Sequence, residues 1–225
     1  IKFPLHFLWL IISKVLQNVH QDDNAELGLT QKKTADSKKS SNAEGSTPAA
    51  SGKKKQEQSK EEELSVSLLK IQIGYIRKAW KHPSADSLLV EEIDVGEAKC
   101  RQVVSGLAKY YTPEELANRY VVLITNVKPG KLRDVVSEGL VLCASNEDHT
   151  VVEPLTAPEG AKIGECITFS GHDGKPEDVL NPKKKQLEKI TPYLGTDGKG
   201  VARFKDSPFM TCSGPCSSSI PNATI

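Results

Sequence analysis

The chain has 225 residues, with 30 lysines and arginines against 29 aspartates and glutamates, so its formal net charge is only +1. This small charge excludes a strong overall electrostatic field, and any attraction for a polyanion must come from local clusters of basic residues. Hydrophobic residues make up 37% of the chain and aromatic residues 5%, a low share that predicts an unpacked portion.

The first segment, residues 1–20, contains a short apolar run at Phe3–Ile12. The run is shorter than the ~20 residues that a membrane-spanning helix needs, and no small-residue cleavage site follows it. We interpret it as a cropped piece of an upstream helix or a spurious addition rather than as an anchor or targeting signal. The chain begins with Ile1 and its single methionine is Met210, which we interpret as the sign of a fragment or an incomplete gene product.

Residues 21–64 are rich in Lys, Ser, Glu, Ala and Gly and contain no aromatic residue. Such a segment buries too little apolar area to offset the entropy lost on ordering. We therefore expect a disordered, charged linker. Contact of its lysines with nucleic acid is an alternative to a simple solvated tether.

A barrel domain is expected over residues 65–146. Apolar residues alternate with polar residues or glycine at 69–75, which is the period of a half-buried strand. Further strands are expected at 88–95, 101–105, 120–124 and 139–144. After the third strand, Thr112 can cap a helix, Pro113 suits its first position, and Glu115 completes a capping box. Five short strands with a helix after the third match the five-stranded oligonucleotide/oligosaccharide-binding barrel, the OB-fold.

Residues 147–225 are expected to form a C-terminal extension packed on the barrel. Strands are predicted at 151–152, 163–169 and 201–204, and a short helix from Asn181 to Ile190. These elements are too few for a separate large core. The predicted fold class is therefore mainly β, a five-stranded OB-fold barrel with a C-terminal α+β extension, preceded by a disordered linker.

The five cysteines are an odd number, spread widely along the chain. This arrangement indicates reduced thiols in a cytoplasmic protein rather than a disulfide framework. Cys143 and Cys166 lie in apolar runs, which predicts that they are core residues. Three residues separate Cys212 from Cys216, whereas zinc knuckles typically have two, so no metal site is expected.

The sequence does not indicate a catalytic centre. It has no GxGxxG, GxxxxGK[ST] or HExxH motif, and no GxSxG motif. The five histidines are isolated, and His82, in a turn before Pro83, is expected to be a hydrogen-bonded structural residue. We therefore predict that the chain is not an enzyme and needs no cofactor.

Basic residues gather in three places: the end of the first strand, the loop between the fourth and fifth strands, and the first turn of the last helix. They are Arg77, Lys78 and Lys81; Lys128, Lys131 and Arg133; and Lys183, Lys184 and Lys185. The helix dipole disfavours cations in a first turn by ~0.3–1 kcal/mol each. Three lysines in this turn therefore favour a role in phosphate contact. The alternative interpretation is that they are ordinary solvated residues at the start of a helix. Since aromatic residues are few, recognition of shape and phosphate is favoured over the reading of unstacked bases.

The stretch Asn126–Leu140 (NVKPGKLRDVVSEGL) resembles the signature of the tRNA-binding domain family. This domain is shared by bacterial tRNA-binding proteins, the appendix of some methionyl- and tyrosyl-tRNA synthetases, the yeast synthetase cofactor and the endothelial monocyte-activating polypeptides. Residues 82–88, 103–107 and 180–185 fit the same family. The resemblance spans essentially all of residues 65–225, and it is strongest to the appendix of plant methionyl-tRNA synthetases.

The resemblance implies an OB-fold that contacts the elbow and backbone of tRNA without reading an anticodon. It also implies that the C-terminal extension keeps the domain monomeric, whereas short bacterial members dimerise. It assigns tRNA contact to Lys131, Arg133, Ser137 and Leu140. The chain departs from the family at Asp134, where Gly is frequent, and at Leu140, where Met is frequent. Asp134 places a negative charge inside the basic loop.

We therefore predict a cytoplasmic, non-catalytic module that binds tRNA for an aminoacyl-tRNA synthetase, the methionyl enzyme by resemblance. The synthetase would be joined in cis through the linker or bound in trans, and no membrane is involved. The ligase motifs HIGH and KMSKS are absent from the chain. The alternatives are a free-standing scaffold of a synthetase complex and a cytokine-like processed fragment. The predicted RNA-binding residues are Arg77, Lys78, Lys81, Lys128, Lys131, Arg133, Ser137, Leu140, Lys183, Lys184 and Lys185.

Overall fold

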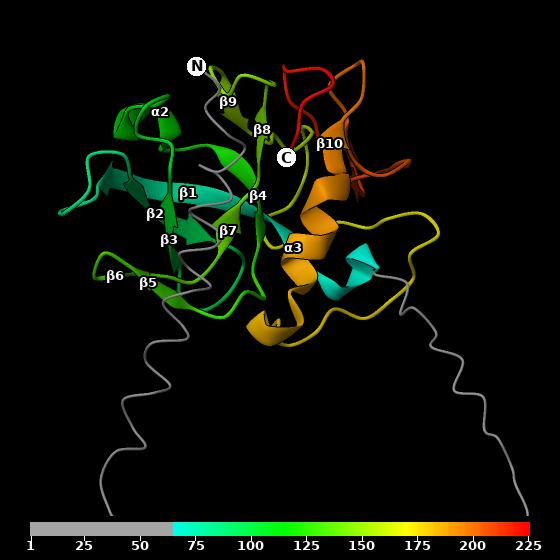
Figure 1. Ribbon diagram of the computed structural model, residues 1–225, viewed down its shortest axis with the longest axis horizontal. Helices are drawn as coiled ribbons and strands as arrows, with labels where there is room; N and C mark the ends of the chain where they lie inside the picture. Colours follow the sequence, from blue (N-terminus) through cyan, green and yellow to red (C-terminus); the bar gives the residue numbers. More distant parts are fainter. Residues whose placement is uncertain (1–64) are drawn as a thin grey trace, which may run out of the picture.

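A five-stranded antiparallel sheet, in the order β3-β2-β1-β4-β7, curls into a nearly closed barrel (Figure 1). The computed structural model describes residues 65–225, so the predictions for residues 1–20 and 21–64 lie outside the described residues. The barrel strands are β1 (Ile71–Lys81), β2 (Leu89–Asp94), β3 (Arg101–Ser105), β4 (Tyr120–Ile124) and β7 (Leu140–Val141). The predicted fold class, a mainly β five-stranded barrel with a C-terminal α+β extension, is confirmed.

The barrel closes where β3 meets the segment that precedes β7. The backbone N–H of Val104 donates to Ser137 Oγ at 3.1 Å, and that of Glu138 donates to the Gln102 carbonyl at 2.8 Å. These bonds satisfy polar groups that an open sheet edge would leave exposed. Ser137 therefore lies at the seam of the barrel.

Strand β1 extends well beyond the predicted residues 69–75 and is buried on both faces along its first half. Ile71 and Ile73 face a core that the barrel shares with the extension. Gly74 faces the barrel interior, where an added Cβ would lie 2.6 Å from Ile93 and 2.7 Å from Leu123. The expectation of a half-buried strand was wrong because residues of the extension cover the outer face.

The short helix α2 (Pro113–Leu116) begins as its capping signals predict. Thr112 Oγ1 accepts from the Glu115 N–H, and the Glu115 carboxylate accepts from the Thr112 N–H. Leu116 is fully buried in the barrel interior beside the core residues of β2 and β4. The predicted capping box is confirmed, and it places a helix between the third and fourth barrel strands.

The stretch predicted as a loop after the fourth strand contains a hairpin, formed by β5 (Gly130–Leu132) and β6 (Val135–Ser137). Its two tip residues, Arg133 and Asp134, have φ values of 44° and 72°. Positive φ at both central residues matches a type I′ turn, whose twist suits a two-residue hairpin. Such turns favour Asn-Gly or Asp-Gly, so Arg-Asp gave no sequence signal for this hairpin.

The predicted strand 139–144 is divided at Leu142, whose N–H donates to the Val122 carbonyl and whose carbonyl accepts from the Leu155 N–H. Beyond it, β8 (Cys143–Ser145) pairs with β9 (Val152–Pro154). This pairing crosses the predicted domain boundary near residue 146, so barrel and extension share sheet structure there. The boundary itself stays a prediction.

The extension consists of short elements that pack on the outer face of the barrel. Its members are η2 (Pro182–Lys184), α3 (Gln186–Ile190), η3 (Thr191–Tyr193), β10 (Leu194–Thr196), β11 (Ala202–Phe204), β12 (Ser207–Pro208), β13 (Met210–Thr211) and β14 (Gly214–Pro215); η1 (Val66–Leu68) precedes β1. Phe169, Phe204 and Phe209 join the core that β1 and β4 begin, and the rings of Phe169 and Phe209 meet edge-to-face at 4.9 Å. No helix within residues 65–225 is long and apolar enough to cross a bilayer.

Two predictions for the extension were wrong. Residues 163–169 form no continuous strand and make only the single bridges Gln72–Cys166 and Thr168–Met210. The helix predicted from Asn181 to Ile190 is broken at Lys185, which has a φ of 52°. The lysines before α3 therefore belong to a separate 3-10 turn, and the argument from the dipole of one continuous helix does not apply to them.

The cysteines divide into buried and exposed thiols. Cys143 and Cys216 are buried, and burial raises the pKa of the Cys216 thiol to about 12. Cys166 is exposed, contrary to its predicted core position, because neighbouring Ile167 takes the inward-facing place. All five cysteines are free. No group of three or more His, Cys, Asp or Glu side chains within residues 65–225 could hold a metal ion.

Candidate nucleic-acid interface

The predicted basic residues lie on three neighbouring segments of the fold: the end of β1, the β5–β6 hairpin with Lys128 just before it, and the η2 turn with Lys185 at its C-terminal end. Figure 1 shows the hairpin and the start of α3 along the same lower edge of the view. A hydrogen bond described below connects the first segment to the second, and a pocket lined from both sides lies between the second and the third. The tertiary structure thus places residues that are about a hundred positions apart in the sequence along one edge.

The β5–β6 hairpin presents Lys131 and Arg133 on its exposed side. Its other side covers a small apolar cluster on β2 and β3, to which Leu132 contributes. His82 holds the hairpin in place through a hydrogen bond. Its Nδ1 accepts from the Ser84 N–H at 3.1 Å, so the ring proton is on Nε2, which donates to the Leu132 carbonyl at 2.9 Å. The predicted structural role of His82 is confirmed, and it links the end of β1 to the hairpin.

The end of β1 carries three exposed cations with different surroundings. Lys78 and Lys81 extend from the strand next to the turn that contains His82. Arg77 instead forms an ion pair with Asp94 at 2.7 Å, and its guanidinium lies 4.8 Å from the centre of the Tyr75 ring. The hydrogen bond from Arg77 holds the pKa of Asp94 below its usual value. Lys78 and Lys81 are therefore better placed than Arg77 to meet an incoming phosphate.

The η2 turn exposes Lys183, Lys184 and Lys185. Asn181 caps the turn, since its Oδ1 accepts from the Lys183 N–H at 2.9 Å. Lys184 lies 3.7 Å from Glu177, and Lys185 lies 3.7 Å from Glu188. Exposed ion pairs of this kind contribute at most ~1 kcal/mol, so a phosphate can compete for both lysines.

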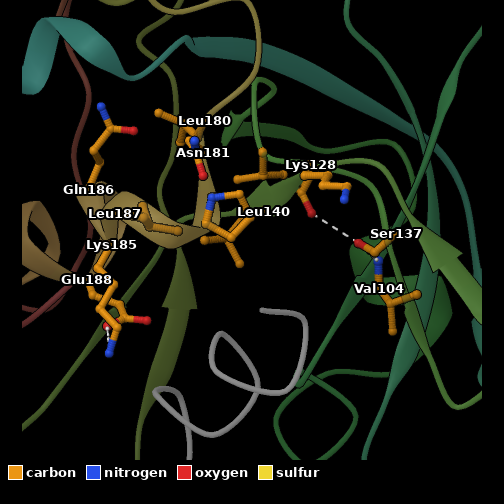
Figure 2. A pocket seen from close by; sticks show the side chains of 13 residues that line it. Val104, Lys128, Ser137, Leu140, Leu180, Asn181, Lys185, Gln186, Leu187 and Glu188 are labelled. Atoms are coloured by element: carbon orange, nitrogen blue, oxygen red, sulfur yellow. Dashed lines mark hydrogen bonds and ion pairs between the residues drawn. The ribbon is translucent and has the colours of Figure 1, made fainter. Parts of the chain in front are cut away.

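A pocket joins this turn to the barrel (Figure 2). Lys128 and Leu140 line it from the barrel side, and Lys185 lines it from the η2–α3 side. Ser137 also lines it, but its side chain is buried, with Oγ donating to the Gly139 carbonyl at 3.0 Å and accepting from the Val104 N–H. Its contacts in the structure are therefore with the protein, and direct contact of Ser137 with RNA stays a prediction.

Sequence reasoning missed an aromatic patch beside β1. Tyr75 and Tyr120 are paired across β1 and β4, and their rings meet edge-to-face at 5.0 Å. Tyr120 is 42% exposed, and nearby Arg119 lies 5.3 Å from the ring centre of Tyr111. Nucleic-acid bases stack on aromatic rings and on arginine planes. Neither partner could be found without the strand register, because 45 positions separate Tyr75 from Tyr120.

An antiparallel barrel with this strand order and a helix between the third and fourth strands is an OB-fold, an architecture that frequently binds oligonucleotides. Residues 71–166 match the family model described as "putative tRNA binding domain". The C-terminal domain of Plasmodium vivax p43 has a similar structure, with a TM-score of 0.67 and 32% identity over 71% of this chain and 97% of that one.

Two curated relatives extend the comparison. The chain is 46% identical over 208 residues to the cytoplasmic methionine–tRNA ligase of Arabidopsis thaliana, covering 91% of this chain and 26% of the ligase. It is 49% identical over 146 residues to the mouse aminoacyl tRNA synthase complex-interacting multifunctional protein 1, covering 65% of this chain and 46% of the relative. The chain belongs to the tRNA-binding domain family, which confirms the resemblance seen in its motifs. It spans about a quarter of the length of the ligase relative.

Proposed function

We propose that the chain is a non-catalytic module that binds tRNA and delivers or retains it for an aminoacyl-tRNA synthetase in the cytoplasm. The observation that carries the proposal is the convergence of three basic segments, two on the OB-fold barrel and one on its extension, along one edge of the fold. Family membership supports tRNA as the ligand, and relatives named as cytoplasmic tRNA ligases support the compartment. The proposed partner synthetase is the methionyl enzyme, because 91% of this chain is similar to part of a methionine–tRNA ligase.

The proposed binding mode is sequence-independent. Exposed lysines and arginines on rigid elements contact phosphates, and the release of counterions from the RNA supplies most of the affinity. Such contacts fix the position of the nucleic acid without reading its bases. A module of this kind raises the effective concentration of tRNA at a tethered catalytic domain. The proposed contact residues are the eleven predicted from the sequence, with the exposed lysines and Arg133 foremost.

The synthetase can be reached in two ways. The similarity to a methionine–tRNA ligase favours a covalent arrangement in cis. The similarity to a complex-interacting protein favours the second candidate, a scaffold that meets its synthetase in trans. In both arrangements the described residues act as a monomer that holds tRNA.

The test is tRNA binding by the full chain, measured by fluorescence anisotropy over a range of salt concentrations. Each phosphate contact contributes about 0.9 to the slope of log K against log salt for a duplex. The double substitution Lys131→Glu and Arg133→Glu should weaken binding by roughly ten- to a hundredfold and reduce the slope by about 2. Both residues are exposed on the hairpin, so the stability of the fold should not change.

The matched control is the double substitution Lys99→Glu and Lys199→Glu, which changes the net charge equally at two exposed positions outside the three basic segments. The control should retain nearly the wild-type affinity. Equal losses in both double variants would show that net charge, and not this edge, governs binding. Binding that does not respond to salt would refute phosphate contact altogether.

A further inference from the structure

We propose that Cys166 and Cys212 form a reversible disulfide when the protein meets an oxidising small disulfide, and that this bond links the β13–β14 hairpin to the segment of residues 163–169. In the structure both thiols are free and exposed. The proposal concerns a site of covalent modification in the extension, and it does not rest on the binding of tRNA.

The two cysteines occupy matching positions on neighbouring segments of the chain. Thr168 and Met210 form an antiparallel bridge, in which the Thr168 N–H donates to the Met210 carbonyl at 2.9 Å and the Met210 N–H donates to the Thr168 carbonyl at 3.1 Å. In an antiparallel pair, two residues back along one strand correspond to two residues forward along the other. This register sets Cys166 opposite Cys212, although the two residues are far apart in the sequence.

The side chains of Cys166 and Cys212 also share one face. Successive residues of an extended chain point to opposite faces, and both cysteines are exposed while their neighbours on these segments turn inward. The buried neighbours are Ile167, Phe169, Phe209 and Thr211. In a regular ladder a pair at this register has Cα atoms about 5.5 Å apart, within the roughly 4.4–6.8 Å that a disulfide spans.

A second contact holds Cys212 beside Cys166. Cys212 is at the tip of the β13–β14 hairpin, where Thr211 pairs with Gly214. Its backbone N–H donates to Oε1 of Glu165 at 2.5 Å, and Glu165 directly precedes Cys166 in the chain. The carboxylate therefore fixes the hairpin tip next to Cys166, and rotation of the two exposed side chains brings the sulfur atoms together.

The surroundings of the thiols indicate the order of the two exchange steps. The carboxylate of Glu165 raises the pKa of the Cys212 thiol, through a hydrogen bond and through its negative charge. Cys166 is therefore the first nucleophile: its thiolate attacks one sulfur of oxidised glutathione, which forms a mixed disulfide and releases one glutathione thiolate. The sulfur of Cys212 then displaces the second glutathione from Cys166. The two released thiolates take up the two protons, so one oxidised glutathione becomes two reduced molecules.

The disulfide would close a covalent ring over residues 166–212, which includes the η2 turn, α3 and β11. A cross-link that closes a ring of about 45 residues reduces the freedom of the unfolded chain, so the oxidised extension should be harder to unfold. Disulfides of cytoplasmic proteins are usually transient and respond to redox conditions. We therefore expect this bond to form under oxidation and to be lost on reduction.

The test is oxidation of the folded full chain with oxidised glutathione, followed by mass spectrometry of its peptides without reduction. The wild-type protein should give one linked peptide that joins Cys166 to Cys212 and is lighter than its two parts by two hydrogens. Cys212→Ser should stop at a mixed disulfide of glutathione on Cys166. Cys100→Ser, which removes a half-exposed thiol on the barrel, is the matched control and should still form the cross-link.

The second readout is urea denaturation of the oxidised and reduced wild-type protein. The midpoint should rise by roughly 1–2 M on oxidation and return to its original value on reduction. Glutathione bound to both Cys166 and Cys212 without a cross-link, or pairing of either residue with Cys100, would overturn the proposed site. A cross-link that forms equally well in urea would show that the folded register does not direct it. An unchanged midpoint in the cross-linked protein would refute the stabilisation of the extension.

Discussion

The carboxyl group of Glu91 is buried in the barrel, and replacing it with glutamine tests how that burial couples stability to pH. Glu91 lies on β2 between Leu89 and Ile93, which belong to the interior core, and its side chain is 0% exposed. Ser105 Oγ donates to Oε1, while Oε2 has no partner among residues 65–225. Burial raises the pKa of Glu91 to about 8, although the hydrogen bond from Ser105 opposes the shift.

The pKa of Glu91 is higher in the folded protein than the value of 4.5 expected for the unfolded chain. Between these two values the folded state holds a proton that the unfolded chain releases, so the free energy of unfolding falls as the pH rises. The contribution of Glu91 is most favourable below about pH 4.5, is lost progressively up to about pH 8, and is constant above it. At about 1.4 kcal/mol per pH unit, its upper limit is on the order of 5 kcal/mol.

Glu91→Gln should remove this dependence because an amide of nearly the same shape cannot ionise but can still accept from Ser105. Urea denaturation of the full chain, followed by circular dichroism from pH 6 to pH 9, measures the effect. The variant should unfold at higher urea than the wild-type protein at pH 9, and the gap should shrink toward pH 6. Glu92→Gln, at the next and partly exposed position, is the control. If the wild-type and Glu91→Gln curves run parallel over this range, the carboxyl group is not titrating inside the barrel.

Two further predictions concern the hairpin. Asp134→Gly should raise tRNA affinity by roughly two- to fivefold, since it removes an exposed carboxylate from the basic tip, and glycine adopts the φ of 72° found there without strain. Asp134→Asn, which also removes the charge, should give a similar gain in affinity. No gain in either variant would show that the charge of Asp134 does not affect binding. His82→Ala should lower the free energy of unfolding by about 1–3 kcal/mol, because the buried Leu132 carbonyl loses its donor. An unchanged urea midpoint, equal to that of the Ser84→Ala control, would contradict the proposed anchoring.

Local signals predicted the barrel strands and their helix well. The strand predictions at 101–105 and 120–124 coincide with β3 and β4, and the capping box at Thr112 forms as expected. Continuous apolar runs bounded by turn residues carry this information within a few positions of the chain. The family motifs were equally local, since each lies within about fifteen residues.

Several features required contacts between distant residues. The outer face of β1, which carries Ile71 and Ile73, is buried only because the extension covers it. The alternation of apolar and polar residues within β1 cannot predict this. The break in the helix at Lys185 depends on how η2 and α3 pack beside the barrel. The turn at Arg133 and Asp134 lacks the glycine by which such a hairpin is usually predicted from sequence. In each case tertiary packing overrode the local pattern.

The sequence by itself determined which residues are basic, where the strands run and to which family the chain belongs, because these properties depend on residue type and short-range spacing. Only the tertiary structure decided that three basic segments share one edge, that Arg77 is paired with Asp94, and that Gln186 lines a pocket against Leu140. These are relations between residues up to about a hundred positions apart. They follow from the closure of the barrel and the packing of the extension, which lower the free energy of the whole chain rather than of any one segment.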